Sequence, residues 1–162
     1  ILFKHLIMAF SAPFMSPVSE KIEAYFNGNN NLNNHSKSFS TTLARGLRIN
    51  IRNLAKEIMF VIPLLVLSLI PIIGIFFSFL IFLVQAYYAG FGNMDYTLER
   101  HFKYNESISF VRRYRGIAIG NGIVFMLLLL IPIFGIILVL PLSVTAASLK
   151  TVQVINAEKL SH

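Results

Sequence analysis

Six arginines stand beside two long apolar runs of this sequence, and the chemistry they could perform is the binding of oxyanions. A guanidinium presents paired donors that match an oxyanion better than the single ammonium of lysine does. Fixed positive charge near a pore mouth also raises the local concentration of an anion. Binding to lipid headgroups fits the same positions, so both interpretations stay open. The six candidates are Arg45, Arg48, Arg52, Arg112, Arg113 and Arg115.

The two apolar runs that must position these arginines share a five-residue signature. It reads IPIIG at residues 70–74, in the middle of the run from 58 to 86, and IPIFG at residues 131–135. One helix of about 29 residues would measure roughly 43 Å, which is too long for a hydrocarbon core of about 30 Å. Because proline followed by glycine can end one helix and start another, we predict two re-entrant helical hairpins. The predicted hairpin tips are Pro71, Gly74, Pro132 and Gly135.

Clusters of lysine and arginine precede, separate and follow the two runs. If each run crossed the membrane once, one cluster would lie on the outer face, which the positive-inside rule disfavours. If each run enters and leaves by the same face, every cluster falls on one side. We therefore expect both hairpin bases to be cytoplasmic and both tips to lie within the bilayer.

The composition is that of an integral membrane protein. Of the 162 residues, 56% are hydrophobic and 13% charged, and the mean hydropathy is +0.69, well outside the range of soluble domains. The net charge of +7 suits anionic lipid or an anionic solute. Nucleic acid is the weakest candidate, since no recognition motif accompanies the basic residues.

Signatures of enzymes and of metal or cofactor binding are missing from the sequence. It contains no cysteine, and His101 has no second histidine at ligand spacing, so we expect no metal and no cofactor. The sequence has no phosphate-binding loop of the Walker type, no Gly-x-Ser-x-Gly and no His-Glu-x-x-His. Neither apolar run contains a charged residue or a histidine. Passive permeation therefore fits better than proton coupling, and we expect no enzymatic activity.

The chain reads as one membrane domain, 1–162, that forms the C-terminal part of a longer protein. We expect residues 1–10 to be the tail of a transmembrane helix that breaks at Pro13, and a short amphipathic helix to start at Ser16-Pro17 and to end at Asn27-Gly28. Residues 27–41, rich in asparagine and serine, are predicted to be a flexible polar loop.

A helix capped by Thr41 or Thr42 is predicted to lead into the first hairpin. Its leucines and isoleucines form one face and its basic residues form another, about 200° away, which is typical of a helix lying along a membrane surface. The outgoing arm is expected to end near Tyr87-Tyr88, followed by a charged connector with local ion pairs among Asp95, Glu99 and Arg100.

Two features of the second hairpin concern packing. Gly116 and Gly120 have the small-xxx-small spacing that lets helices approach closely in lipid. The hydroxyls of Ser143, Thr145 and Ser148 can either bond their own backbone carbonyls or line a polar path.

An ordered set of short segments resembles the CysZ-type sulfate permeases and the wider etoposide-induced protein family. Each segment is weak alone, and the resemblance lies in their order over nearly the whole chain. The segments are residues 12–14 (APF), 19–23 (SEKIE), 52–54 (RNL), 95–96 (DY), 141–147 (PLSVTAA) and the two Ile-Pro-x-x-Gly signatures.

The resemblance implies a multi-pass protein of the bacterial inner membrane with two partly penetrating hairpins, assembled as a homo-oligomer and passing sulfate toward cysteine synthesis. Two departures matter. The family's basic anion-contacting motif lies ahead of its first membrane helix, and we expect this chain to begin after that point, so the site cannot be carried over. Gly46-Leu47-Arg48 lies elsewhere and is not that motif. The family's Asp-Tyr-Pro reads Asp95-Tyr96-Thr97 here. Two functions stay open: a passive anion permease or channel, and a non-transporting scaffold or accessory subunit of a larger membrane complex.

Overall fold

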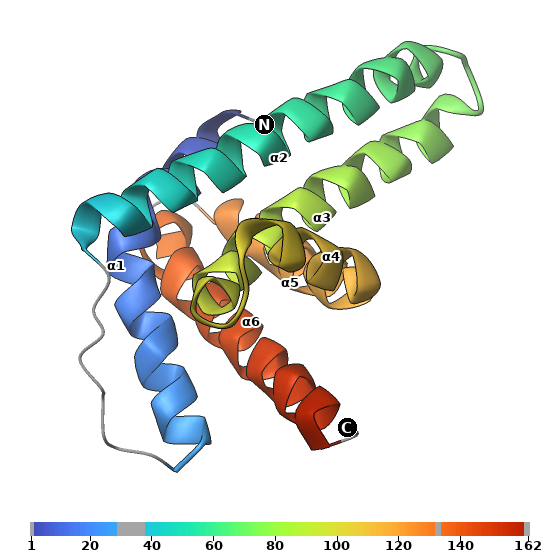
Figure 1. Cartoon of the computed structure of the whole chain (residues 1–162). Coiled ribbons are helices and arrows are strands. Elements are labelled where there is room, and N and C mark those ends of the chain that lie inside the picture. Colours follow the sequence, from blue (N-terminus) through green and yellow to red (C-terminus); the bar gives the residue numbers. More distant parts are fainter. Residues whose placement is uncertain (1, 29–37, 132–133, 161–162) are drawn as a thin grey trace.

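The structure is a computed structural model that describes residues 2–28, 38–131 and 134–160, and these residues form six helices and no strand. The central helix is α3, which contacts each of the other five (Figure 1). The helices are α1 (Leu2–Phe26), α2 (Phe39–Ser68), α3 (Gly74–His101), α4 (Tyr104–Arg113), α5 (Arg115–Leu129) and α6 (Phe134–Leu160). The prediction of an all-α fold is confirmed for this part of the chain.

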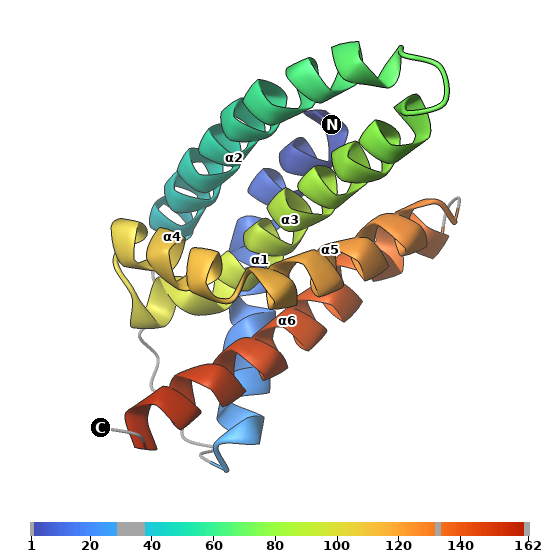
Figure 2. The ribbon, with the colours of Figure 1, turned by 90° about the vertical axis from the view of Figure 1, so that its right-hand side faces the viewer.

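The helices α2 and α3 form one antiparallel pair, and α5 and α6 form another (Figure 2). Residues 69–73 connect α2 to α3. Residues 132–133 lie outside the described residues, so the predicted tip residue Pro132 is not placed, whereas Gly135 falls in the first turn of α6. In Figure 2 the connected ends of both pairs lie at the right, while α4 and the C terminus lie at the left.

Two predicted boundaries of the first hairpin are wrong. Its outgoing arm does not end at Tyr87-Tyr88, because α3 continues without a break to His101. Its incoming helix starts at Phe39, with Ser38 as N-cap, so residues 39–41 of the predicted polar loop are helical. At 30 and 28 residues, α2 and α3 are roughly 45 Å and 42 Å long.

The prediction that α1 breaks at Pro13 is also wrong, because Pro13 and Pro17 both lie inside a continuous 25-residue helix. Proline removes a backbone hydrogen bond, but neighbouring helices can satisfy the freed groups. Pro13 leaves the Ala9 carbonyl without its helical donor, and at the neighbouring residue the hydroxyl of Tyr96 in α3 donates to the Met8 carbonyl at 2.6 Å. The predicted end of the helix is confirmed: α1 stops at Phe26, and Gly28 has a φ of +65°.

The helix α2 has three faces where the sequence indicated two. Its inward face is made mostly of small and polar residues, together with Ile49 and Val61, and lies between the apolar face and the basic face. Ile51, which belongs to the apolar face, is 63% exposed. The inward face consists of Thr42, Gly46, Ile49, Asn50, Asn53, Glu57 and Val61.

Close backbone contact joins α3 to α5 through two small-xxx-small pairs. A Cβ on Gly90 would lie 1.8 Å from the carbonyl oxygen of Ala118, and one on Gly122 would lie 1.7 Å from that of Ala86. Only glycine fits at these crossing points. The close approach predicted at Gly116 and Gly120 is wrong, since a Cβ there would meet nothing within 4 Å.

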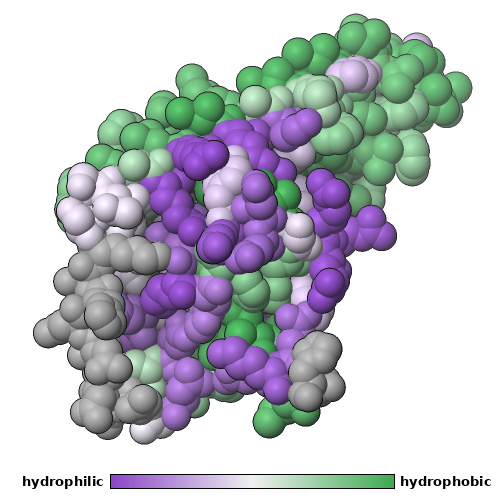
Figure 3. Space-filling model, viewed as in Figure 1, coloured by the Kyte–Doolittle hydropathy of each residue, from purple (hydrophilic) through white to green (hydrophobic). Residues whose placement is uncertain are grey.

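Large apolar side chains cover the part of the first hairpin that projects beyond the other helices, as Figure 3 shows at the upper right. Among them Ile72 is 93% exposed, Ile75 82% and Leu69 76%. By length and composition, α3 and the segment Leu138–Leu160 of α6 could each cross a membrane. Contiguous apolar surface of this extent is typical of contact with lipid or with other proteins.

Candidate functional site

Arg45 is held in the interior rather than offered to a solute. Its Nη2 lies 3.0 Å from Oδ1 of Asp95 and its Nε 3.3 Å from Oδ2, which is a bidentate pair. The guanidinium also donates to Ser107 Oγ at 2.8 Å and to the Phe102 carbonyl at 3.1 Å. These bonds connect α2, α3 and α4, so Arg45 fastens three helices together.

Two further predicted arginines are engaged at the surface. The guanidinium of Arg48 stacks over the ring of Tyr104, 4.1 Å from its centroid, a cation–π contact. Arg113 donates to Glu158 at 3.1 Å, and its side chain is 73% exposed. An exposed ion pair of this kind contributes little to stability.

The remaining three predicted arginines converge on Tyr87. Arg112 comes from the last turn of α4 and Arg115 from the start of α5. Arg52 comes from α2 and lies over the ring of Phe91, whose centroid is 6.3 Å from that of Tyr87. Arg112 and Arg115 are exposed and line the same groove as Tyr87 and Tyr88. They come together because α4 ends at Arg113 and α5 begins at Arg115. We call Arg52, Arg112 and Arg115 the arginine trio.

The arginine trio differs from Arg45 and Arg113, which have carboxylate partners, and from Arg48, which lies apart from it over Tyr104. Within residues 2–28, 38–131 and 134–160, none of its members forms an ion pair with a carboxylate. Arg52 donates to the side-chain oxygen of Asn53 at 2.8 Å and lies 5.3 Å from the ring centroid of Phe91. Three cations without carboxylate partners produce a positive potential that attracts anions.

A buried ionic cluster joins α1 to α2, and sequence reasoning missed it. Lys4 Nζ lies 2.9 Å from Glu57 Oε1, and His5 Nε2 lies 2.8 Å from Glu57 Oε2. The Asn50 amide donates to the Gly46 carbonyl at 2.9 Å, which leaves its oxygen facing His5 Nδ1 at 3.2 Å. The presence of Lys4 and His5 inside the first apolar segment could have predicted this cluster, because an ionisable residue in such a segment needs a partner.

Hydroxyl groups form a second buried connection, between α1, α3 and α6. Ser19, Thr97 and Ser148 lie within 2.8 to 2.9 Å of one another. Of the two roles open to the hydroxyls of α6, Thr145 bonds its own backbone, through the Pro141 carbonyl at 2.7 Å. Ser148 instead bonds other helices, so neither predicted role describes it.

The acidic end of α1 packs against the end of α3. Glu23 accepts bonds from Arg100 at 2.8 Å and from His101 at 2.6 Å. Burial acts to raise the pKa of Glu23, but the hydrogen bonds from His101 and Arg100 outweigh it and hold that pKa below its usual range. The predicted local pairing among Asp95, Glu99 and Arg100 is therefore replaced, for Asp95 and Arg100, by ion pairs with α2 and α1. In the amphipathic segment that follows Ser16-Pro17, Tyr25 is 84% exposed while Ser19 is buried.

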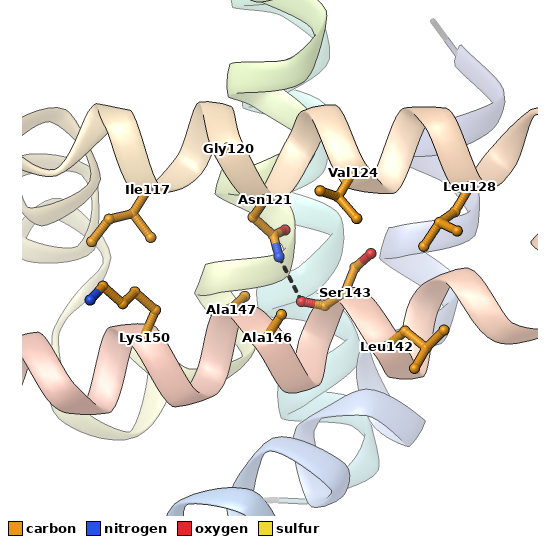
Figure 4. A pocket seen from close by; sticks show the side chains of 10 residues that line it. All are labelled: Ile117, Gly120, Asn121, Val124, Leu128, Leu142, Ser143, Ala146, Ala147 and Lys150. Carbon is orange, nitrogen blue, oxygen red and sulfur yellow. Dashed lines mark hydrogen bonds between the residues drawn. The ribbon is translucent and has the colours of Figure 1, made fainter.

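A shallow groove of about 360 Å³ lies between α5 and α6 (Figure 4). Figure 4 shows the Asn121 side chain pointing from α5 to α6, where it donates to the Ser143 carbonyl at 2.8 Å. The rest of the lining is mostly apolar, with Lys150 at one end. Asn121 also accepts from Asn93 at 2.8 Å, so it fixes α5 to both α3 and α6.

The tip of the first hairpin has strained backbone. Ile72 has a φ of +75°, which is unfavourable for a β-branched residue. Gly74 is required because a Cβ there would lie 2.2 Å from the Ser68 carbonyl oxygen. Gly74 therefore lets the start of α3 close against the end of α2, and Pro71 lies in the connecting segment.

The fold and the arginine trio define a helical membrane protein with a cluster of positively charged side chains where its apolar hairpins join the helical core. Residues 1–140 match the family model described as Sulfate transporter CysZ/Etoposide-induced protein 2.4. The chain belongs to this family, which confirms the resemblance seen in the sequence. The family is one of membrane transporters and not of enzymes. A search of curated proteins found no match.

Proposed function

We propose that this protein is a passive permease or channel for an oxyanion, with sulfate as the substrate and uptake toward cysteine synthesis as its use. Membership of a sulfate transporter family supports the substrate class. The observation that supports an anion path in this chain is the convergence of three arginines from α2, α4 and α5 without carboxylate partners.

The electrostatic argument concerns the entry and exit of a dianion. Moving sulfate into hydrocarbon without compensation costs on the order of tens of kcal/mol. The arginine trio lies where the first hairpin meets α5, so it raises the local anion concentration at the hairpin base. Arginine suits this task because its paired donors match two oxygens of one anion.

We place both hairpin bases at the cytoplasmic face of a bacterial inner membrane, with the tips inside the bilayer. The arm of α2 from Ile58 to Ser68 is about 11 residues, or roughly 16 Å of helix, which reaches into a bilayer without crossing it. The connected ends of the two helix pairs lie on the same side in Figure 2, as entry from one face requires. The exposed apolar surface of the projecting arm fits burial in lipid.

The anion path is proposed to run between copies of the chain, in a homo-oligomer. Glycine-to-carbonyl contacts at Gly90 and Gly122 leave no room for an anion between α3 and α5. The exposed hairpin also presents apolar surface to any neighbour. One observation favours the scaffold alternative: α3 is buried from Tyr88 to Glu99, as in a helix whose task is structural.

Sulfate flux into liposomes tests the proposal. The full-length protein is compared with the triple variant Arg52→Gln, Arg112→Gln, Arg115→Gln and with a control, Arg48→Gln with Arg113→Gln. The control removes two arginine charges outside the trio, one stacked on Tyr104 and one paired with Glu158. We expect the triple variant to lose flux by about tenfold or more, because one charge-assisted hydrogen bond is worth about 1.5 kcal/mol. The control is expected to stay within about twofold of wild type.

Membrane insertion and oligomer size are measured for every variant, so that a failure to fold is not mistaken for loss of the anion path. Normal flux in a correctly inserted triple variant contradicts the assignment of the arginine trio. Absence of sulfate flux in the wild-type protein contradicts the permease proposal and favours the scaffold.

A further inference from the structure

A groove of about 430 Å³ lies along the base of the first hairpin, and two members of the arginine trio, Arg112 and Arg115, line it. Its walls are apolar over most of its length: Phe60 and Leu64 from α2, Leu80 and Leu83 from α3, and Ile119 from α5. Tyr87, Tyr88, Arg112 and Arg115 line it as well.

The polar and apolar linings are separated along the groove. On α3 the distance from Leu80 to Tyr87 is seven residues, or roughly 10 Å along the helix axis. The side chains toward the hairpin tip are aliphatic, while the tyrosines and the two arginines come toward the base. A ligand that fills this groove must therefore be amphipathic, with its polar end at the base.

The charge at the polar end selects an anion. Arg112 and Arg115 are exposed, and no carboxylate in the described part of the chain forms an ion pair with either. Their neighbour Arg113 does have a carboxylate partner, Glu158. Arg52 adds a third positive charge near Tyr87. A phosphate matches paired guanidinium donors and a cluster of positive charge at the membrane surface.

We propose that this groove is a binding site for an anionic phospholipid, with its phosphate on Arg112 and Arg115 and an acyl chain along Phe60, Leu64, Leu80 and Leu83. The arrangement agrees with a hairpin base at the headgroup level and arms in the hydrocarbon. It goes beyond the proposed function, because lipid can occupy the groove whether or not sulfate crosses the membrane. If both hold, the headgroup and free sulfate compete for the same guanidinium groups.

Native mass spectrometry of the full-length protein tests the site. The protein is transferred from nanodiscs that contain equal amounts of phosphatidylglycerol and phosphatidylcholine, and bound lipids are counted. We expect retention of phosphatidylglycerol, reduced by roughly tenfold or more in Arg112→Gln with Arg115→Gln. The matched control Arg113→Gln, which alters the arginine between them, is expected to retain the lipid as wild type does.

A second pair of variants tests the acyl chain. Leu83→Trp fills the groove and is expected to lower lipid retention, whereas Phe79→Trp, on the same helix at a 58% exposed position outside the groove, is expected to leave it unchanged. Equal retention of the two lipids, or equal loss in Arg113→Gln, would overturn the proposal. So would binding of soluble glycerol phosphate as tight as that of phosphatidylglycerol, because the apolar wall would then contribute nothing.

These outcomes are separate from those of the flux experiment. Lipid retention without sulfate flux supports the proposed lipid site and contradicts the proposed permease function. Sulfate flux that depends on the arginine trio, with no selective lipid retention, supports the proposed permease function and contradicts the proposed lipid site.

Discussion

The two halves of α3 differ in composition and in burial. The more apolar half is the exposed one, which is the reverse of what is usual in a soluble protein. From Gly74 to Gln85 the helix is almost wholly apolar, yet Gly74 is its only buried residue. From Ala86 to Glu99 every residue except Tyr87 is buried, although this half contains an asparagine, an aspartate and a glutamate. In water the hydrophobic effect would favour the reverse.

This difference teaches where each half finds its stabilising contacts. The proximal half, 86–99, is held by polar contacts and by close backbone approach, which remain available in lipid. The distal half has few protein contacts, and its apolar side chains gain nothing by leaving hydrocarbon. Along α3, therefore, hydrophobicity alone does not predict which residues are buried.

The largest predicted effect comes from enlarging a glycine at the crossing of α3 and α5. Gly122→Ala places a Cβ where a carbonyl oxygen lies 1.7 Å away, so the helices must separate. We expect a loss of at least about 4 kcal/mol of stability, or failure to fold. Thermal unfolding in nanodiscs measures this loss.

Gly120→Ala is the matched control, two residues away on the same helix with nothing within 4 Å. It is expected to be neutral or slightly stabilising, because alanine favours helix by about 1 kcal/mol over glycine. Equal stability of the two variants would contradict the importance of the backbone contact.

The second prediction concerns the ionic cluster that fixes α1 to the proximal part of the first hairpin. Glu57→Gln removes the carboxylate while Lys4 and His5 stay buried at 5% and 2% exposure. Breaking a buried pair from one side costs about 3 kcal/mol, because the partner charge is left uncompensated. The melting temperature of the purified protein is the measurement.

Arg113→Gln serves as the comparison for this cluster, since it breaks an ion pair in which the Arg113 side chain is 73% exposed and that of Glu158 31% exposed. Its expected cost is below about 1 kcal/mol. If Glu57→Gln proved as mild, the cluster would be solvated in the membrane-inserted protein and would not fasten α1.

Sequence reasoning predicted the helical class, the two apolar segments and the segment that connects α2 to α3, because these follow from length and from proline and glycine. It misplaced the packing for a physical reason. Periodicity shows which face of a helix is apolar, but in α2 the apolar face points outward and a small, polar face between it and the arginines points inward. Glu57 and Asn50 could not be assigned to the core from hydrophobicity.

The candidate site was predicted in part. All six arginines were visible in the sequence, but their partners were not, since Arg45 and Asp95 are 50 residues apart in the chain. Only the tertiary arrangement separates the paired arginines from the arginine trio. The pair Gly116 and Gly120 has the same small-xxx-small spacing as the pair Ala118 and Gly122. Only the position of α3 shows which pair makes the close helix contact.

The smallest predicted effect belongs to the distal half, at the hairpin tip. Ile72 has a φ of +75° and a side chain that is 93% exposed, so it adds strain without packing against the rest of the chain. Ile72→Gly relieves the strain, worth about 1 to 2 kcal/mol for an L-residue, while the flexible unfolded chain offsets up to about 1 kcal/mol of that gain.

We therefore expect Ile72→Gly to be neutral or to stabilise by up to about 1 kcal/mol, measured by thermal unfolding. Ile72→Ala separates the two contributions, because it removes the side chain but keeps a Cβ and hence the strain. Alanine should be no more stable than wild type, and less stable than glycine. Marked destabilisation by both variants would show that the Ile72 side chain packs against a neighbouring molecule at the tip. The contrast between a packed proximal half and an exposed distal half would then fail at this point.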